Sequence, residues 1–533
     1  KDERINERVK IIRYLIENNY NKAQLENELN NLIKEESLKE NIKEVDKSRI
    51  VVDNKGILQD LDELYREKYK RFIELKDLNV QIFYVDIDGN NDELDLSISN
   101  IKERQEQSFL LFKEILQEYI NELLFNPNYG LDKFLSSRIR HGMLKDYLSK
   151  PFKNHNILNS KKDSKSSEYL INQFVEENYS DCEDKSKHKI LKLLSYFSEK
   201  IMSKINDVEN WIRIKSQEDK DGLFNYELFE DNAYIYNLYN KSKDINDYNS
   251  FFDTLTDEFW KLTETNLKII RDKIDIELYN YFRHQLKELE NNLRMLKNDL
   301  HIGILDDLVG EVGVCCSILK QDLELVKNWF HIKKDNQYID FKFQDLLNTC
   351  IEINNKLNNN YSKIKDRIEI NVQIPLIFKG DKFTYWVDII NILYLNAIKH
   401  CGFQRIDDIK IELEAKVIND ITKYNREKKT EYNDLIKVQL DKKYIFLKLK
   451  NNLSNEINEE EVANKVDDIF TNIKSCTYEN YITCEGGSGI YKMTNILKNN
   501  IKTNSFYQFY CLEHEFCIEI FIELKDTFIV GGF

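Results

Sequence analysis

Residues 388–400 read Asp388-Ile-Ile-Asn-Ile-Leu-Tyr-Leu-Asn396-Ala-Ile-Lys-His400, and this stretch decides the fold that we expect for the C-terminal part of the chain. Its apolar residues recur every three or four positions, which is the spacing of one face of an α-helix. The apolar face consists of Trp386, Ile389, Leu393 and Ala397. A second face carries Asn396, Lys399 and His400. One face can therefore pack against a sheet while the other reaches a ligand.

The polar face of this helix suits a phosphate ligand with a metal ion. An Asn side-chain oxygen is a hard, neutral ligand for Mg²⁺, which keeps most of its waters and bridges phosphates. Lys399 or His400 could then contact a phosphate. Taken alone, Asn396 is more simply a polar residue on a helix surface, so the assignment depends on the neighbouring sequence.

The segments around this helix alternate between helical and extended patterns. Helices are predicted at 341–358, 382–400 and 489–500, and strands at 367–374, 409–418, 436–450, 505–512 and 516–524. This order predicts an α/β sandwich with a largely antiparallel sheet.

Two further stretches carry polar or glycine residues at positions from which they could contact a ligand. The stretch from Ile445 to Leu453 reads as strand, and its two-residue period places Ile445, Leu447, Leu449 and Asn451 on one face. Residues 485–492 read Glu485-Gly-Gly-Ser-Gly-Ile-Tyr-Lys492 and open an amphipathic helix. Glycine lets the backbone approach a ligand closely, and a helix N-terminus favours anions. This turn follows the 388–400 helix by about 90 residues, in a chain that is otherwise poor in glycine.

Together the three stretches resemble the N-box, the adenine-binding strand and the glycine box of the GHKL class of ATPases, which have the Bergerat fold. The resemblance covers about residues 335–525, with Asp468-Ile469-Phe470 in the place of the F-box, and is closest to diverged histidine-kinase-like domains. It implies ATP and Mg²⁺ as cofactors, with Asn396 as the metal ligand. The residues that it implies at the nucleotide are Asn396, Lys399, His400, Asn451, Gly487 and Gly489.

The chain departs from this family at the adenine-binding strand and in the N-box. Asn451 stands where the family has an Asp that accepts a hydrogen bond from adenine, and its uncharged amide oxygen predicts weaker recognition. Leu453 and Asn455 replace glycines of the family. Ile392 stands where the hydrolysing branches have a Glu that activates water, and an isoleucine cannot take a proton. We therefore expect weak or absent hydrolysis, unless Asp388 substitutes for that Glu.

Histidine kinases manage without this Glu because a histidine accepts the phosphoryl group. The candidate acceptors here are His284, within Phe282-Arg-His-Gln-Leu-Lys287, and His301. Neither is followed by a clear acidic partner, so a structural role is the simpler interpretation of each.

The composition limits what the rest of the chain can be. With 15 Gly and 3 Pro in 533 residues, long helices are favoured over a loop-rich all-β fold. The formal net charge of −15 argues against broad nucleic-acid binding. The nine cysteines show no Cys-x-x-Cys spacing, which fits reduced thiols in the cytoplasm. No apolar run approaches the ~18 residues that a membrane span needs, so we expect no membrane partner.

The N-terminal part is predicted to be mainly helical. Residues 1–190 form one expected domain, with a β-hairpin near 80–98 and a polar linker or insertion near 153–188. Residues 191–335 are expected to form long helices that pair with each other, dimerise or carry a signal. Residues 336–533 complete the predicted organisation as the ATP-binding domain.

The segment Arg138-Ile-Arg-His-Gly142 resembles the Arg/His motif of HEPN-type RNases. In that motif the histidine acts as a general acid or base and the arginine stabilises phosphate charge. The spacing between Arg138 and His141 is shorter than in that family, so a basic helix end capped by Gly142 is the simpler interpretation.

The expected fold is therefore α+β, with a large mainly α-helical N-terminal region followed by a Bergerat-type ATP-binding domain. We expect ATP occupancy to regulate the helical region, which acts as an effector or scaffold. The expected partners are ATP and, through the helices, another protein or a second copy of the chain. The alternatives are a histidine-kinase-like phosphotransferase and an ATP-gated HEPN-like RNase of an antiviral or toxin type.

Overall fold

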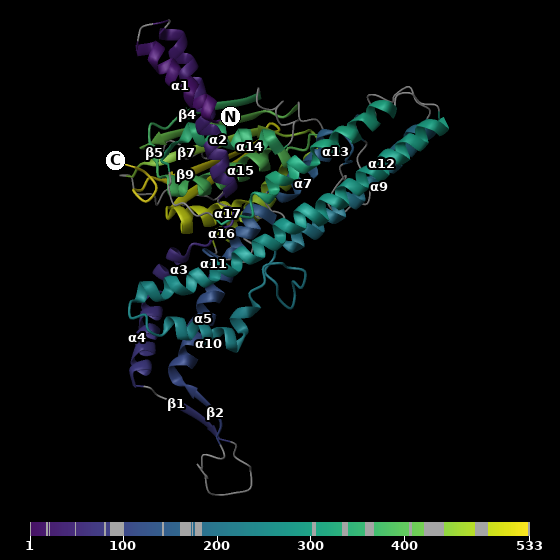
Figure 1. Cartoon of the computed structure of the whole chain (residues 1–533). Helices are drawn as coiled ribbons and strands as arrows, with labels where there is room; N and C mark the ends of the chain where they lie inside the picture. The colour runs from purple at the N-terminus through teal and green to yellow at the C-terminus, as the bar shows by residue number, and fades with distance from the viewer. Residues whose placement is uncertain are drawn as a thin grey trace. The chain divides into compact units, whose positions relative to one another are not determined.

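A computed structural model gives the architecture of the chain (Figure 1). The structure describes residues 2–17, 20, 22–47, 49–78, 81–85, 101–140, 143–159, 172, 174–175, 184–300, 305–332, 339–357, 367–403, 408–419, 442–474 and 489–530. The chain divides into two compact units. Unit 1 comprises residues 1–48 and 334–533, and unit 2 comprises residues 49–333.

Long helices form the frame of unit 2. They are α9 (Asp184–Trp211), α11 (Tyr248–Lys273), α12 (Tyr279–Leu300) and α13 (Leu305–Lys327). A π-helical segment, Ile274–Leu278, joins α11 to α12 without a break. Lys327 Nζ lies 2.9 Å from a carboxylate oxygen of Asp275, and Lys297 Nζ lies 2.5 Å from one of Asp306. Because these contacts join the end of α13 to the segment that leads into α12, and the end of α12 to the start of α13, the two helices are antiparallel (Figure 1).

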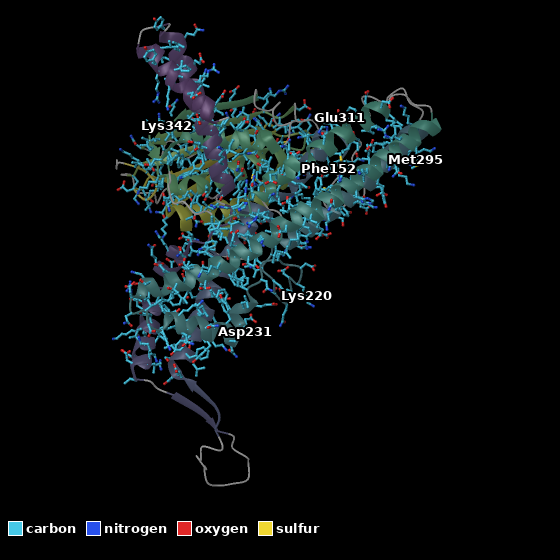
Figure 2. All side chains as sticks on the ribbon, in the orientation of Figure 1. Phe152, Lys220, Asp231, Met295, Glu311 and Lys342 are labelled. Atoms are coloured by element: carbon cyan, nitrogen blue, oxygen red, sulfur yellow. The ribbon has the colours of Figure 1, made fainter. Side chains whose placement is uncertain are left out.

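Shorter helices complete unit 2 around an aromatic core. They are α3 (Asn54–Asp60), α4 (Asp62–Leu78), α5 (Gln107–Phe125), α6 (Leu131–Phe134), α7 (Leu144–Asn154) and α10 (Asn232–Ser242), with a π-helical segment Leu135–Arg140 and a 3-10 turn Glu227–Glu230. Tyr119 of α5 packs edge-on against Phe252 of α11 at 4.9 Å between ring centroids. Figure 2 shows Phe152 of α7 and Glu311 of α13, whose helices pack against each other.

A small hairpin precedes α5. Strand β1 (Gln81–Val85) pairs antiparallel with β2 (Ile101–Glu106). Residues 86–100, which include the second strand that the sequence predicts, lie outside the described residues. The apolar spacing predicts a helix from Ile101, but α5 begins at Gln107 because residues 101–106 are taken up by the pairing with β1.

Unit 1 is built around a five-stranded mixed sheet of order β4-β6-β7-β9-β8. The strands are β4 (Ile368–Gln373), β6 (Ile411–Ile418), β7 (Tyr444–Asn452), β8 (Ser505–Leu512) and β9 (Glu515–Glu523). The pair β4/β6 is parallel, whereas β6/β7, β7/β9 and β8/β9 are antiparallel. A separate short pair joins β3 (Phe341–Lys342) to β5 (Ile377–Phe378).

The helices of unit 1 include the predicted 388–400 helix. They are α1 (Asp2–Glu17), α2 (Lys22–Lys47), α14 (Phe343–Leu357), α15 (Phe383–Lys399), α16 (Glu459–Lys474) and α17 (Gly489–Asn495), and α17 continues as a π-helical segment, Ile496–Ile501. The predicted apolar face of α15 is buried, and the Trp386 ring lies 5.4 Å from Phe378 and 5.7 Å from Phe528. The helix α2 packs on α14, where Asn41 Nδ2 donates to Thr349 Oγ1 at 3.3 Å.

The α+β class is confirmed, with a mainly helical region and a C-terminal mixed sheet. The assignment of that sheet to the Bergerat fold stays a prediction. Residues 1–48 belong to the same compact unit as the C-terminal region, whereas the sequence analysis groups them with residues up to 190. The boundaries at 190 and 335 and the 153–188 linker stay predictions. In the described part of the chain, no helix has both the length and the apolar composition needed to cross a membrane.

Candidate functional site

Gly489, the first residue of α17, lies against Asn396 of α15. A Cβ atom added to Gly489 would stand 3.1 Å from Asn396 Nδ2 and 3.2 Å from Ile392 Cγ2. Such contacts are tighter than side chains normally accept, so the absence of a Cβ allows α17 to approach α15 this closely. The packing of the two helices thus brings together two predicted ligand residues that are far apart in the sequence.

Lys399 and His400 stand at the C-terminal end of α15, and both are exposed. His400 N donates to Asn396 O at 3.0 Å and so closes the last turn of the helix. Partial loss of water around the ring lowers the pKa of His400, and the charges of Lys399 and of Lys465 on α16 lower it further. His400 is therefore biased towards its neutral form, in a local field that is positive and suited to an anion.

The chain beyond α15 is tied to the segment that follows β7. Ser454 N donates to Cys401 O at 2.8 Å. Gly402 has a positive φ of 76°, and a Cβ there would stand 2.5 Å from Ile457 Cγ1. This turn therefore requires glycine, and it holds residues 454–457 against the end of α15.

Asn451 lies in β7 between Ile411 of β6 and Phe516 of β9. It is 3% exposed and shares a face of the strand with the buried residues Leu447 and Leu449, as its two-residue period predicts. Its Nδ2 donates to Asn452 O at 2.9 Å. Its Oδ1 is buried and has no hydrogen-bond partner among the described residues.

A buried acceptor without a partner costs free energy, typically about 1–3 kcal/mol, unless a ligand supplies a donor. The amino group of an adenine base is such a donor. The residues present therefore fit a nucleotide: an unpaired acceptor for the base, and a glycine next to an Asn that suits Mg²⁺.

The residues that bear on hydrolysis lie on α15. Ile392 is half-buried next to Gly489, so no carboxylate occupies the position where the hydrolysing branches have Glu. Asp388, one turn earlier, is half-buried and already engaged with other groups. Burial raises the pKa of Cys350 well above its usual range, and the charge of Asp388 raises it further.

The predicted phosphoacceptor His284 is exposed on α12 in unit 2. The other acceptor candidate, His301, lies outside the described residues, as do Gly487 and His141.

Arg138 is buried in the π-helical segment Leu135–Arg140. It is 5% exposed, its guanidinium lies 4.9 Å from the Phe134 ring centroid, and its carbonyl accepts a hydrogen bond from Arg49 Nη1 at 3.0 Å. The neighbouring Arg140 pairs with Asp132 at 2.9 Å and donates to Ile212 O. Arg138 and Arg140 are thus packed inside unit 2. This gives no support to an RNA-cleaving role for Arg138, which stays a prediction.

The sequence analysis missed α16 and its contacts. The polar composition of residues 453–486 predicts no regular element, yet residues 459–474 form α16. The signal is present in Val462, Val466, Ile469 and Ile473, which recur at helical spacing after three acidic residues in the first turn.

Comparisons with known proteins match both parts of the chain. The Y4jQ family profile matches residues 59–330, which lie within unit 2. The Detocs histidine-protein kinase DtcA of Enterobacter cloacae is 24% identical over 400 residues, covering 74% of this chain and 32% of that protein. The uncharacterized protein y4jQ of Sinorhizobium fredii is 25% identical over 234 residues, covering 44% of this chain and 22% of that protein.

The chain therefore spans a third or less of the length of these two relatives. The alignment with the kinase is longer than residues 1–333 together, so that similarity reaches into the C-terminal part of the chain.

Proposed function

This chain belongs to the Y4jQ family, and we propose that its C-terminal unit binds ATP with Mg²⁺ and regulates the helical unit in a histidine-kinase-like protein. The observation that carries the proposal is the approach of Gly489 to Asn396. The resemblance to GHKL ATPases assigns these two residues to the same phosphate site, although nothing in their local sequences requires them to meet.

The Oδ1 of Asn451, which finds no donor in the described part of the chain, supports the same proposal at the other end of the nucleotide. A buried amide oxygen that lacks a donor is matched by the amino group of adenine, whereas the carbonyl oxygen that guanine has in that position would repel it. Adenine nucleotides are therefore the preferred ligands.

Each residue of the site has a defined role in this proposal. Asn396 supplies one oxygen ligand to Mg²⁺, which, when bound, neutralises charge on the phosphates. Lys399 contributes positive charge near the phosphates, and the neutral ring of His400 contacts them. Gly489 leaves room for the triphosphate beside Asn396, and the resemblance assigns Gly487 to the nucleotide as well. Ile392 can neither orient water nor take its proton, so the bound ATP persists.

A nucleotide that persists acts as a regulatory ligand. It shifts the population of conformations by its difference in affinity between them. In this proposal the part of the protein that responds to the nucleotide is the helical unit, which is the part that the family profile matches.

A second candidate function is phosphoryl transfer to a histidine. It is favoured by the 24% identity to a protein named as a histidine-protein kinase, over an alignment that covers 74% of this chain. His284 is exposed on α12 and is the acceptor that this function would use.

Titration calorimetry of the full chain with ATP, with and without Mg²⁺, tests the proposal. We expect binding that is strengthened by Mg²⁺ and weakened by Asn396→Ala. The matched control is Asn464→Ala, an exposed asparagine on α16. An absence of ATP binding to the unmodified chain, or equal affinities for all three proteins, would refute the site.

A further inference from the structure

The two ends of the proposed nucleotide site lie on different elements. Asn451 is on β7, whereas Gly489 opens α17. The helix α16 lies between them in the sequence and contacts the neighbours of both residues. Its 16 residues make it a rigid element about 24 Å long.

The β8–β9 turn connects the base end of the site to the start of α16. His514 O accepts a hydrogen bond from Leu453 N, two residues after Asn451, at 2.6 Å. His514 N donates to Glu459 Oε1, in the first turn of α16, at 2.7 Å. The backbone of His514 is therefore bonded on one side to Leu453, the residue that follows the strand of Asn451, and on the other side to α16.

This turn has a strained backbone. Glu513 and His514 have φ values of 54° and 57°, in the left-handed region that favours glycine. Each costs on the order of 1 kcal/mol or more, so the surrounding contacts must hold the turn in place. The bonds from Leu453 and to Glu459 are such contacts.

Tyr491 connects the other end of α16 to the phosphate end of the site. It lies two residues after Gly489 in α17 and is 6% exposed. Its ring packs against Ile469 and Ile473 of α16, and its hydroxyl accepts a hydrogen bond from Asn472 Nδ2 at 3.0 Å. The position of Gly489 beside Asn396 thus depends on a residue that α16 holds.

We propose that Glu459 and Tyr491 are positioning residues through which α16 couples the base end of the nucleotide site to its phosphate end. This inference rests on the proposed ATP binding. Neither residue contacts the ligand in it: Glu459 fixes the β8–β9 turn beside Asn451, and Tyr491 fixes the start of α17 beside Asn396. Because both contacts are made by one rigid helix, removing either contact uncouples the two ends of the site.

A double-mutant cycle on the full chain tests this coupling, with Mg-ATP as the ligand. Glu459→Ala removes the bond to His514, and Tyr491→Phe keeps the ring but removes the hydroxyl. We expect each variant to weaken ATP affinity by about 2- to 10-fold, the range for one lost hydrogen bond. We expect the double variant to bind ATP no more weakly than the weaker-binding single variant, because the loss of one contact already removes the coupling.

Three controls separate this role from simple support of the fold. Glu459→Gln keeps an acceptor oxygen and should restore affinity, whereas Glu461→Ala changes an exposed residue of the same helical turn and should have no effect. Thermal unfolding without nucleotide should show similar midpoints for Tyr491→Phe, Glu459→Gln and the unmodified chain.

Each outcome has a separate meaning. Fold-changes that multiply in the double variant would overturn the coupling, because independent supports act additively in free energy. Unchanged ATP affinity in both single variants would also overturn it. If the unmodified chain binds no ATP, the proposed function itself fails, which is a different result.

Discussion

Gly489 and Asn396 lie so close that a methyl group on the glycine would stand 3.1 Å from the Asn396 amide nitrogen. The two residues come from different helices, α17 and α15. A side chain at position 489 would displace the Asn396 amide or Ile392. The geometry of the proposed phosphate site is therefore sensitive to a single methyl group.

Gly489→Ala is expected to weaken Mg-ATP affinity by about 10-fold or more, because the Asn396 side chain must shift to admit the methyl group. Calorimetric titration of the full chain measures this change. The matched control is Gly313→Ala on α13, where an added Cβ meets nothing within 4 Å, and it should leave binding unchanged. Equal affinities for the parent and both variants would contradict the assignment of Gly489.

Asn451→Ala is expected to reduce ATP affinity by about 5-fold or more, because the buried acceptor for the adenine amino group is lost. In the free protein the variant relieves the unpaired Oδ1 but also loses the bond from Nδ2 to Asn452 O, so these two effects on stability oppose each other. Asn451→Asp supplies a charged acceptor and should bind ATP at least as tightly as Asn451→Ala. A binding assay that finds all three proteins equal would remove Asn451 from the site.

ATP turnover by the unmodified chain is expected to be near background, because Ile392 supplies no proton acceptor. Ile392→Glu should raise steady-state phosphate release. Ile392→Gln should not, because Gln has the shape of Glu but cannot take a proton. A coupled phosphate assay measures both. Brisk turnover of the parent chain that Asn396→Ala abolishes would show that another base exists, and Asp388 would be the first candidate.

Incubation with γ-labelled ATP tests the histidine-kinase candidate. The regulatory proposal predicts no acid-labile label on the protein, whereas phosphoryl transfer predicts label that His284→Gln removes. His188→Gln is the matched control, because His188 is also exposed on a long helix of unit 2. Label that disappears only in the His284 variant would replace the regulatory proposal with the kinase.

The pH dependence of stability is expected to include a contribution from His400. Its pKa is lowered in the folded chain, so the unfolded chain binds the proton more readily. The stability contribution is complete above about pH 6.5, the ordinary histidine value, and is lost as the pH falls through the lower folded-state pKa. Chemical unfolding of the parent and of His400→Gln should show a smaller loss in the variant at low pH. Identical pH profiles would mean that His400 does not titrate in this way.

The same linkage predicts how ATP affinity changes with pH. Phosphate charge favours the protonated ring, so ATP affinity should rise as the pH falls from about 7.5 to about 6 more in the parent than in His400→Gln. Because the protonation of ATP itself is common to both proteins, the difference between them isolates His400.

The sequence by itself determined the elements of unit 1 that have strong local periodicity. The three-to-four-residue spacing around Trp386 and Leu393 predicted α15 and its buried face, and the two-residue spacing up to Asn451 predicted β7. These patterns are local because the helix and strand repeats alone decide which side chains share a face. The start of α5 was not predicted because the pairing of Ile101–Glu106 with β1 is not a local feature, and α16 was not predicted because the polar composition of 453–486 outweighed the helical spacing of its few apolar residues.

Only the tertiary structure decided which of the candidate residues meet. It brought Gly489 to Asn396, left the Asn451 oxygen without a partner among the residues that the structure describes, and buried Arg138. It also bonded His514 to both Leu453 and Glu459. No local repeat specifies such contacts, since they join residues that are brought together only when helices and strands pack into one core.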